Sequence, residues 1–404
     1  MDRRLLVLAL GMFALGTDGF VVAGVLPEIA RSLHVGIGAA AQMTTIYAIT
    51  FALLAPVIAA FGAHVPRKHL LLAGLSIFVI ANLGTAIAPT FAIALATRAL
   101  AGLGAAIFSP TATGSASVIV PPERRGFALA AVITGMTVST AIGSPIGTII
   151  GGLVDWRWTM VFVAALAAVS WIGVFALLSH IPMLPAISLA KRLAPLADVR
   201  VGLTLTTSFL FFTGIYTIYT YFAVVFDRAT GGDTTLLGGL LVLWGLAGIA
   251  SNLLGGRLID VVGNHKVLTT MLAFVLVDFI LLQWTSAHVW TAILAVVFWG
   301  GFGWGTVVPL QHRLVGISPP IAPLLLGLNN SAIFFGTTAA GLMGAVGIQV
   351  LGVRNLGFIG AGFVALAMIM SELAARKIAT FKQKAAVSQS VNFGSANPVE
   401  QPEA

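Results

Sequence analysis

The stretch Gly16–Glu28, GTDGFVVAGVLPE, places a carboxylate, Asp18, inside the first long apolar run of the chain. An aspartate in hydrocarbon costs about 3 kcal/mol on insertion scales, and intramembrane acids are functional by default. The run closes with Leu26, Pro27 and Glu28. If this run crosses a membrane, Asp18 is a candidate proton site, substrate site or packing group.

The composition identifies the class of protein. The chain has 404 residues, of which 58% are hydrophobic and 8% charged, whereas soluble domains carry about 25% charged residues. A mean hydropathy of +1.03 leaves too few polar side chains to cover a water-soluble core. The apolar runs are unbroken over about 20 residues, which favours helices over the short alternating strands of a barrel. The chain is therefore a polytopic, all-α membrane protein.

Turn and charge signals divide the chain into twelve predicted spans: 5–27, 40–63, 70–89, 91–119, 126–152, 159–179, 201–226, 234–256, 267–285, 289–311, 321–349 and 355–375. A basic, proline-containing segment at 180–200 separates a six-span half at 1–179 from a second at 201–378. The polar residues after 379 have nothing to bury, so we expect 379–404 to be a disordered tail.

The basic residues give the orientation. With the N-terminus in the cytoplasm, sixteen of the 21 lysines and arginines fall on the cytoplasmic side, four on the opposite side and Arg98 inside a span. The positive-inside rule therefore predicts that both termini are cytoplasmic. The same distribution explains the net charge of +8 without a nucleic-acid partner, and the absence of cysteine excludes disulfides and thiolate metal sites.

The two halves resemble each other in their small residues, which recur every four positions or a multiple of four in the fifth and the eleventh spans. These residues are Gly135, Gly143, Gly147 and Gly151 in the first half, and Ala332, Gly336, Ala340 and Gly344 in the second. Such a stripe shares one helix face and lets another backbone approach closely. Duplicated six-helix halves are typical of secondary transporters, which bind substrate near the middle of the membrane between the halves.

Four stretches carry a resemblance to a known family. They are Asp18 with Leu26–Glu28, the arginine motif Arg98–Gly104, the proline–glycine motif Gly143–Gly151 followed by Trp156–Trp158, and the loop motif Gly256–Lys266 with its first-half remnant Arg67 and Lys68. Together they resemble the major facilitator superfamily, and within it the bacterial twelve-helix drug:proton antiporters of the arabinose-, chloramphenicol- and purine-efflux subgroup.

That resemblance implies two pseudo-symmetric six-helix bundles in the bacterial inner membrane, a monomeric state, and proton-coupled efflux of a small organic compound without cofactor or metal. The alternative is an exporter or facilitator of one metabolite, such as a sugar, nucleoside or purine, without proton coupling. A membrane enzyme is disfavoured because no cluster of His, Asp or Glu and no ATP-binding motif occurs.

Asp18 and Arg98 are predicted to lie at similar depth. Asp18 precedes Leu26 by eight residues, about 12 Å along a helix, and Arg98 follows Phe91 by seven, about 10 Å. If the first and fourth spans are neighbours, the two charges could pair. The functional hypothesis is proton uptake and release by Asp18, and the alternative is a permanent ion pair that fixes packing. For Asp278, in the ninth span, we expect a packing or interface role.

Polar and aromatic residues inside the spans are the substrate-binding candidates: Tyr47, Thr50, Tyr216, Tyr219, Trp304, Asn329 and Asn330. The alternative for each is an interhelical hydrogen bond. A second set is expected to govern conformational change, through close packing and a kink in the fifth span and through charge contacts in the loop motif: Gly143, Pro145, Gly147, Gly151, Arg67, Lys68, Asp260 and Gly263. In the first-half loop motif only Arg67 and Lys68 match the pattern, so the resemblance gives Asp260 the larger share of that role.

Overall fold

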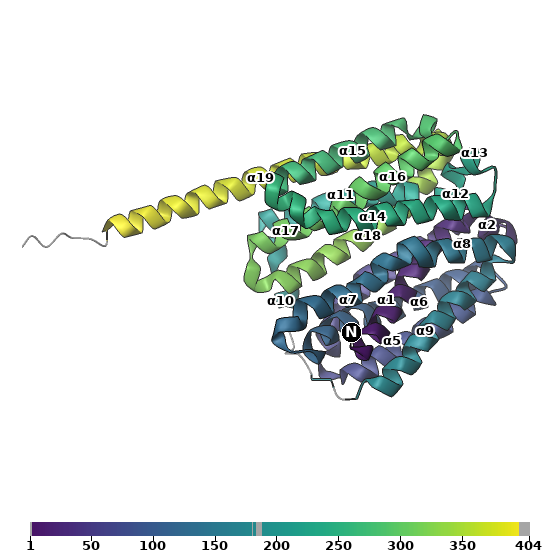
Figure 1. Cartoon of the computed structure of the whole chain (residues 1–404), viewed down its shortest axis with the longest axis horizontal. Coiled ribbons are helices and arrows are strands. Elements are labelled where there is room, and N and C mark those ends of the chain that lie inside the picture. Colours follow the sequence, from purple (N-terminus) through teal and green to yellow (C-terminus); the bar gives the residue numbers. More distant parts are fainter. Residues whose placement is uncertain (1, 180, 183–187, 396–404) are drawn as a thin grey trace, which may run out of the picture.

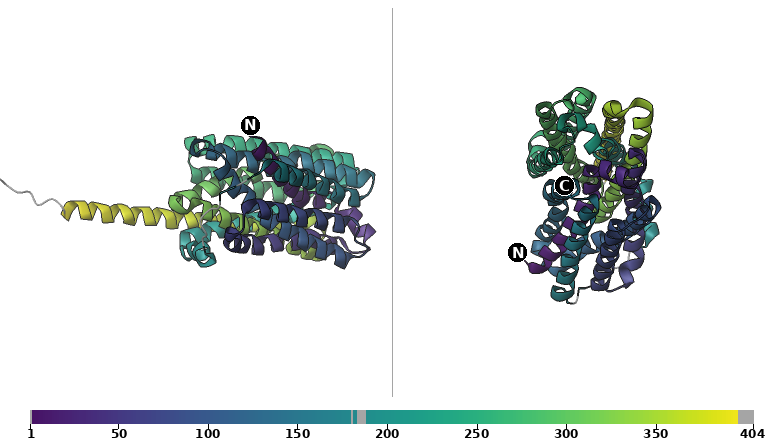
Figure 2. Two further views of the ribbon diagram at one scale, coloured as in Figure 1. Left: turned by 90° about the horizontal axis from the view of Figure 1, so that it is seen from below. Right: turned by 90° about the vertical axis from the view of Figure 1, so that its right-hand side faces the viewer.

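The computed structural model describes residues 2–179, 181–182 and 188–395. Its regular elements in those ranges are helices, and twelve of them are long and apolar enough to cross a membrane. They form two bundles of six, with the first bundle below the second in Figure 1 and the helices running roughly along one direction in Figure 2. The fold class and the number of spans predicted from the sequence are confirmed.

The spans of the first bundle are α1 (Arg3–Val21), α4 (Gln42–Phe61), α5 (Arg67–Ala86), α6 (Phe91–Ile119), α7 (Arg125–Val138) continued by α8 (Ser144–Leu153), and α9 (Trp156–Leu177). Those of the second are α11 (Val199–Tyr219), α14 (Thr234–Val262), α15 (Asn264–Thr285), α16 (Val289–Gly305) continued by α17 (Val307–Ile317), α18 (Ala322–Leu351) and α19 (Leu356–Ser395). Short helices lie between them: α2 (Leu26–Ser32), α3 (Ile37–Ala40), α10 (Leu189–Leu193), α12 (Phe222–Val225) and α13 (Asp227–Thr230).

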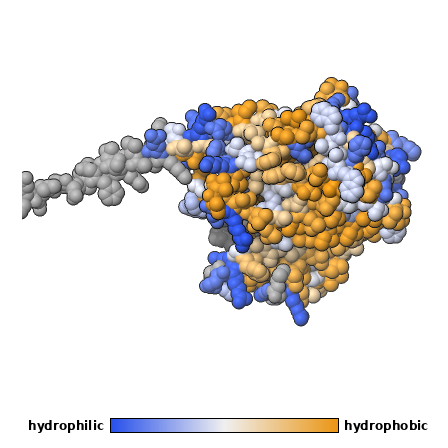
Figure 3. Space-filling view, turned by 45° about the horizontal axis from the view of Figure 1, so that its top comes forward, coloured by the Kyte–Doolittle hydropathy of each residue, from blue (hydrophilic) through white to orange (hydrophobic). Residues whose placement is uncertain are grey.

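Large apolar side chains cover the outside of the bundles. Leu253 and Trp290, for example, are 77% and 80% exposed. Figure 3 shows hydrophobic residues over the middle of the surface and hydrophilic residues toward its two ends. A helix satisfies its own backbone hydrogen bonds, so such a surface is stable against lipid and would not be in water.

Several helix ends follow directly from local sequence. The side chains of Asp155, Asp198 and Asp233 each accept a hydrogen bond from a backbone N–H in the first turn of the helix that follows. These caps satisfy donors that have no partner within the helix. Gly263 and Gly352 end α14 and α18 with φ of 92° and 79°, a conformation that favours glycine.

The small-residue stripe of the fifth span packs closely on another helix, as the spacing predicts, and the structure identifies that helix as α1. A β-carbon at Gly147 would lie 2.5 Å from Cγ2 of Val21, and one at Gly143 would overlap Thr17. Just before Pro145, residues Ser139–Gly143 form a π-helical segment between α7 and α8. Proline cannot donate a backbone hydrogen bond, so the helix widens here, where we expected a kink.

The stripe of the eleventh span has the equivalent position in the second bundle. A β-carbon at Gly336 would lie 2.7 Å from the carbonyl oxygen of Phe209 in α11, and one at Gly344 would overlap the ring of Tyr221. The fifth span thus packs on the first as the eleventh packs on the seventh. This equivalence is the internal repeat that the sequence indicates.

Several boundaries differ from the sequence prediction by a few residues, and three of the differences are larger or fall in a predicted motif. The loop motif is helical up to Val262, because no residue before Gly263 breaks α14. The seventh span ends at Tyr219 instead of 226, since the chain turns there into α12. The last helix, α19, continues to Ser395, beyond residue 379, where we expected the polar tail to begin; disorder of that tail stays a prediction. Residues 396–404 lie outside the described part.

The bundles contact each other in the half that contains α2, which we name the α2 end; the opposite side is the α10 end. At the α2 end, the amide of Gln42 in α4 lies 3.5 Å from the carbonyl oxygen of Gly341 in α18. A β-carbon at Gly238 in α14 would lie 2.9 Å from Ile149 in α8. About halfway along α4 and α18, Phe51 stacks on Phe334 with ring centroids 4.0 Å apart.

Candidate transport site

Asp18 of α1 and Arg98 of α6 form a buried ion pair. The Nη1 of Arg98 donates to Oδ1 of Asp18 at 2.6 Å, and both side chains are 0% exposed. The pairing predicted from depth is therefore present. Among the ion pairs of the described residues, it is the one in which both side chains are fully buried.

Glycines of the arginine motif hold α6 in place. A β-carbon at Gly102 would lie 2.6 Å from the carbonyl oxygen of Tyr47 in α4, and one at Gly104 would lie 2.8 Å from the carbonyl oxygen of Gly74 in α5. Both neighbouring backbones can approach α6 only because these positions lack a side chain. Close packing on two sides then fixes the height at which Arg98 meets α1.

The pair is incompletely satisfied. Oδ2 of Asp18 and both Nε and Nη2 of Arg98 are buried without a hydrogen-bond partner among the described residues. A two-point contact between carboxylate and guanidinium would use these atoms, and it is the stronger arrangement. A buried ion pair that leaves polar atoms unsatisfied repays less of its desolvation cost, so the pair is poorly suited to a purely structural role.

Tyr47 and Asn82 surround the pair. The guanidinium carbon of Arg98 lies 4.8 Å from the centroid of the Tyr47 ring, in a cation–π contact. Asn82 of α5 is fully buried and is a further polar neighbour of Asp18. Tyr47, predicted as a substrate residue, thus lies against Arg98, and its contact with substrate stays a prediction.

A cluster of aromatic side chains lies where the bundles meet, and we name it the indole cluster. It consists of Phe20, Tyr216, Tyr219, Trp244, Trp299 and Trp304. The ring centroids of Tyr219 and Trp244 are 4.6 Å apart, and those of Phe20 and Tyr219 are 5.4 Å apart. Three predicted substrate residues, Tyr216, Tyr219 and Trp304, are therefore brought together, at the bundle interface.

Tyr219 joins the bundles by hydrogen bonds as well. Its hydroxyl group donates to the carbonyl oxygen of Phe20 at 3.2 Å and lies 3.3 Å from the hydroxyl of Ser144. All three groups are buried, so the contacts are shielded from water. This side chain of the second bundle is thereby fastened to α1 and α8 of the first.

The indole N–H groups of Trp244, Trp299 and Trp304 are buried without an acceptor among the described residues. Leaving one buried donor unpaired costs about 1–3 kcal/mol. Three in one cluster are unusual, because most buried polar atoms in proteins have a partner.

The other predicted substrate residues are placed differently. The Asn329 side chain accepts a hydrogen bond from Ser208 at 2.6 Å, which is the interhelical contact given above as the alternative. Asn330 is exposed, and Thr50 is half-buried beside Gly102. Ligand contact by these residues stays a prediction.

Two of the predicted conformational residues, Arg67 and Lys68, make polar contacts inside the first bundle. Lys68 donates to the carbonyl oxygen of Phe175 at 2.8 Å, and Arg67 lies 3.5 Å from the carbonyl oxygen of Thr111 and from the hydroxyl of Ser115. Asp260 is exposed near the end of α14. Gating by Asp260 and by Arg67 stays a prediction.

Asp278 is the second acid within a span. It lies in α15, half-buried, and its Oδ2 is buried without a hydrogen-bond partner in the described ranges. Asp278 therefore lies on a different helix from the Asp18–Arg98 pair. Its role in packing or at an interface stays a prediction.

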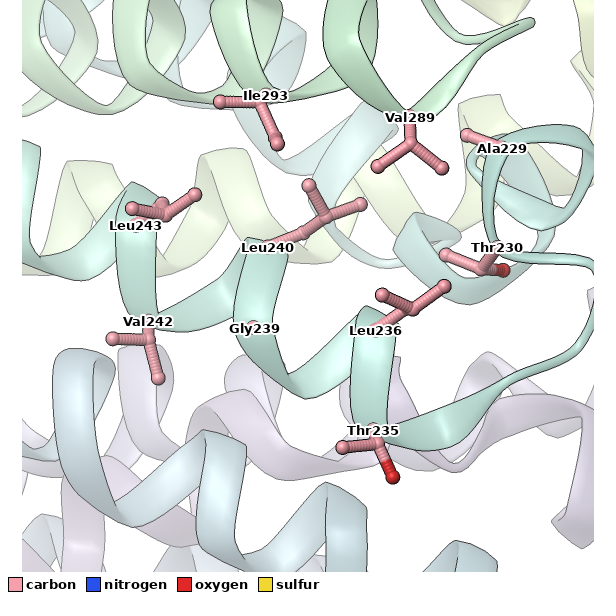
Figure 4. A pocket seen from close by; sticks show the side chains of 10 residues that line it. All are labelled: Ala229, Thr230, Thr235, Leu236, Gly239, Leu240, Val242, Leu243, Val289 and Ile293. Carbon is pink, nitrogen blue, oxygen red and sulfur yellow. The ribbon is translucent and has the colours of Figure 1, made fainter.

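A half-open pocket of about 360 Å³ lies elsewhere, between α13, α14 and α16. Figure 4 shows Leu236, Leu240 and Leu243 on its α14 wall and Val289 and Ile293 on the opposite side. Its lining is apolar apart from Thr230 and Thr235. None of the predicted substrate residues lines it, so it is distinct from the indole cluster.

Sequence reasoning missed Phe20, Asn82, Trp244 and Trp299. Asn82 stands alone as an amide in its apolar span, and that was a usable signal. The aromatic residues carried none, because an aromatic ring in an apolar span serves equally well against lipid or at a bundle interface. Only the tertiary structure distinguishes Trp299, which is 1% exposed, from Trp290.

The profile of a protein family described as the Major Facilitator Superfamily matches residues 8–321. An inner membrane transport protein of Escherichia coli (strain K12), YdhP, is 29% identical over 378 residues, which cover 93% of this chain and 97% of that protein. A chloramphenicol resistance protein of Streptomyces lividans is 32% identical over 267 residues, which cover 64% of this chain and 67% of that protein.

A solved structure with a similar fold is that of the nucleoside transporter NupG. It matches with a TM-score of 0.78 and covers 92% of this chain and 100% of that chain. The sequence identity is 11%, so the likeness concerns the fold alone.

Proposed function

This chain belongs to the Major Facilitator Superfamily, and on that premise we propose that it exports a small organic compound in exchange for protons. The single observation that carries the proposal is the buried, one-point ion pair between Asp18 and Arg98. Efflux as the direction is supported by similarity to a protein named for chloramphenicol resistance.

Asp18 is the proton carrier in this proposal. Its carboxylate has one strong contact, to Arg98, and one buried oxygen free to take a proton. Protonation neutralises Asp18 and releases Arg98 from its partner. Because the pair joins α1 to α6, its state affects how α1 packs, and α1 also carries Phe20 of the indole cluster. Proton binding and the bundle interface are thus linked through one helix.

The orientation follows from the basic residues. Most lysines and arginines lie at the α10 end, so that end faces the cytoplasm with both termini. Similarity to an inner membrane transport protein of Escherichia coli supports the bacterial inner membrane as the location. The contacts of Tyr219 and Gln42 then close the site toward the outside. Export requires that these contacts open while the cytoplasmic side closes, by rocking of the bundles around the site.

The test combines cells and purified protein. Cells that lack their major exporters and express this chain should accumulate less chloramphenicol, and a protonophore should abolish the difference. In proteoliposomes, chloramphenicol should drive proton release from wild-type protein but not from Asp18→Asn. Asp278→Asn is the matched control, since it removes the other intramembrane acid and should leave coupling intact.

Three outcomes would contradict the proposal. Normal proton exchange by Asp18→Asn removes Asp18 from the coupling mechanism. Export that ignores the protonophore favours the alternative of a facilitator without proton coupling. If chloramphenicol itself is not exported, the same assay is run with a sugar, a nucleoside and a purine, and export of none of these would end the efflux proposal.

A further inference from the structure

We propose that the indole cluster is the substrate-binding surface and that it selects uncharged, planar compounds that carry hydrogen-bond acceptors. The inference rests on the proposed function and adds the chemical class of the substrate to it. It is carried by the arrangement of Phe20 from one bundle against two tryptophans and two tyrosines from the other, with Trp299 packed behind them on Trp244.

Flat aromatic faces dominate the cluster. Trp244 is central, with ring centroids 5.5 Å from both Trp299 and Trp304 and 4.6 Å from Tyr219. Aromatic rings pack on one another by offset stacking or edge contacts, so a planar ligand can take the place of one of the rings that neighbour it. The surface therefore suits a planar compound.

Its polar atoms are mainly donors. The three indole nitrogens can donate and cannot accept, and all three are buried without an acceptor in the described part of the chain. A ligand that carries carbonyl, ether or ring-nitrogen acceptors would supply the missing partners. Binding such a ligand would then remove the energetic cost of the unpaired indole N–H groups in the ligand-free cluster.

The electrostatics favour an uncharged ligand. Aromatic faces alone would attract a cation, but the cluster also holds three N–H donors without an acceptor among the described residues, and a donor gains nothing from a cation. No carboxylate belongs to the cluster, and Asp18, two residues before Phe20, is engaged by Arg98. An anion would meet no basic side chain within the cluster either.

Phe20 makes access dependent on the transport cycle. Its ring lies against Tyr216, Tyr219, Trp244 and Trp304, whose centroids are 5.4 to 6.3 Å away. Phe20 belongs to the first bundle, and those four residues belong to the second. Movement of one bundle against the other therefore removes one wall and uncovers the tryptophans.

The test uses three tricyclic probes of similar size: acridone, which is neutral and has a carbonyl acceptor; anthracene, which has no acceptor; and 10-methylacridinium, which is a cation. Binding of each radiolabelled probe is measured on purified full-length protein in nanodiscs. We expect acridone to bind at least tenfold more tightly than either of the other two.

Phenylalanine substitutions separate the N–H group from the ring. Trp244→Phe, Trp299→Phe and Trp304→Phe keep an aromatic ring and lose the donor, and at least one should weaken acridone binding about fivefold, the worth of one hydrogen bond. The same variant should bind anthracene as wild type does. Trp290→Phe, at an 80% exposed position on the lipid side, is the matched control and should bind acridone normally.

The inference is overturned if acridone does not bind, if it binds no better than anthracene, or if all three variants bind it normally. Normal binding by all three would mean that neighbouring ring faces already accept the indole N–H groups. Failure of the inference is distinguishable from failure of the function. Protonophore-sensitive chloramphenicol export with no preference for acridone defeats only the inference, whereas acridone binding without any export defeats the proposed function.

Discussion

Asp18 and Arg98 meet at 2.6 Å inside the first bundle, with both side chains fully buried, and they touch at one point only. The pair therefore joins α1 to α6 without satisfying either group completely. It is both a source of stability, because each charge needs the other, and a contact that protonation can break.

The first prediction concerns the stability of this pair. Asp18→Asn leaves Arg98 buried without a counter-charge, and such a loss costs about 3–5 kcal/mol. The double variant Asp18→Asn with Arg98→Met removes both charges and should recover most of that loss. Thermal unfolding in detergent measures the stability of the wild type, the single variant and the double variant. A double variant no more stable than the single one would show that the charges do not depend on each other.

The second prediction concerns the small-residue stripe. Gly147→Leu places a side chain where a β-carbon alone would lie 2.5 Å from Val21, so α8 and α1 cannot keep their contact. Membrane insertion should be nearly normal, while export falls at least tenfold. Gly126→Leu, where a β-carbon would meet nothing within 4 Å, is the control for helix propensity and should export normally. Wild-type export by Gly147→Leu would separate this contact from transport.

The third prediction concerns closure at the α2 end. Tyr219→Phe removes a hydroxyl that links the bundles, at about 1 kcal/mol for each hydrogen bond lost, and should shift the population toward separation there. The chain has no cysteine, so spin labels on Arg31→Cys and Asp227→Cys are unique. Their distance distribution should gain a longer component in Tyr219→Phe.

Tyr221→Phe is the matched control for this measurement. It also loses a buried hydroxyl contact, to the carbonyl oxygen of Gly341 at 2.8 Å, but that contact stays within the second bundle. Equal shifts in both variants would mean that the Tyr219 contacts do not control closure.

The fourth prediction concerns the start of the second bundle. Asp198 accepts hydrogen bonds from the backbone N–H of Arg200 at 2.8 Å and from its guanidinium at 2.6 Å. These contacts hold the pKa of the Asp198 carboxyl below its ordinary value of 3.8. The stabilisation is complete above that ordinary pKa and is lost as the pH falls through the lowered one.

Two substitutions divide the contribution of Asp198. Asp198→Asn keeps a capping side chain and removes the charge, so it should cost little and should lack the acid-dependent loss. Asp198→Ala removes the cap as well and should destabilise α11 by about 0.5–2 kcal/mol. Thermal unfolding at pH 7 and pH 3 checks both. Identical behaviour of the two variants would show that the cap contributes nothing.

Much of the fold was predictable because lipid imposes one rule. Each span must satisfy its own backbone hydrogen bonds and present apolar side chains. A contiguous apolar stretch of sequence is therefore enough to identify each span. Helix boundaries were less predictable where the sequence lacks a strong breaker. Thus α14 continues into the loop motif as far as Val262, and α11 ends at Tyr219 inside an apolar run.

Within the candidate site, Asp18 and Arg98 could be predicted because charges in apolar spans are rare and their depths match. Trp244 and Trp299 could not, because the same residue type faces lipid at Trp290. For Asn329 the sequence indicated an unusual residue but not its partner. Its polarity within an apolar span was visible, whereas its hydrogen bond to Ser208 depends on which helix lies opposite.

The sequence by itself determined the number of spans, the duplication, the small-residue stripes and the charged residues inside the membrane, because each of these depends on local hydropathy and spacing. Only the tertiary structure decided that Arg98 touches Asp18 at a single point, and that Phe20 of one bundle covers the tryptophans of the other. Those contacts join residues 80 and 224 positions apart. They depend on how whole helices pack, which no single span specifies.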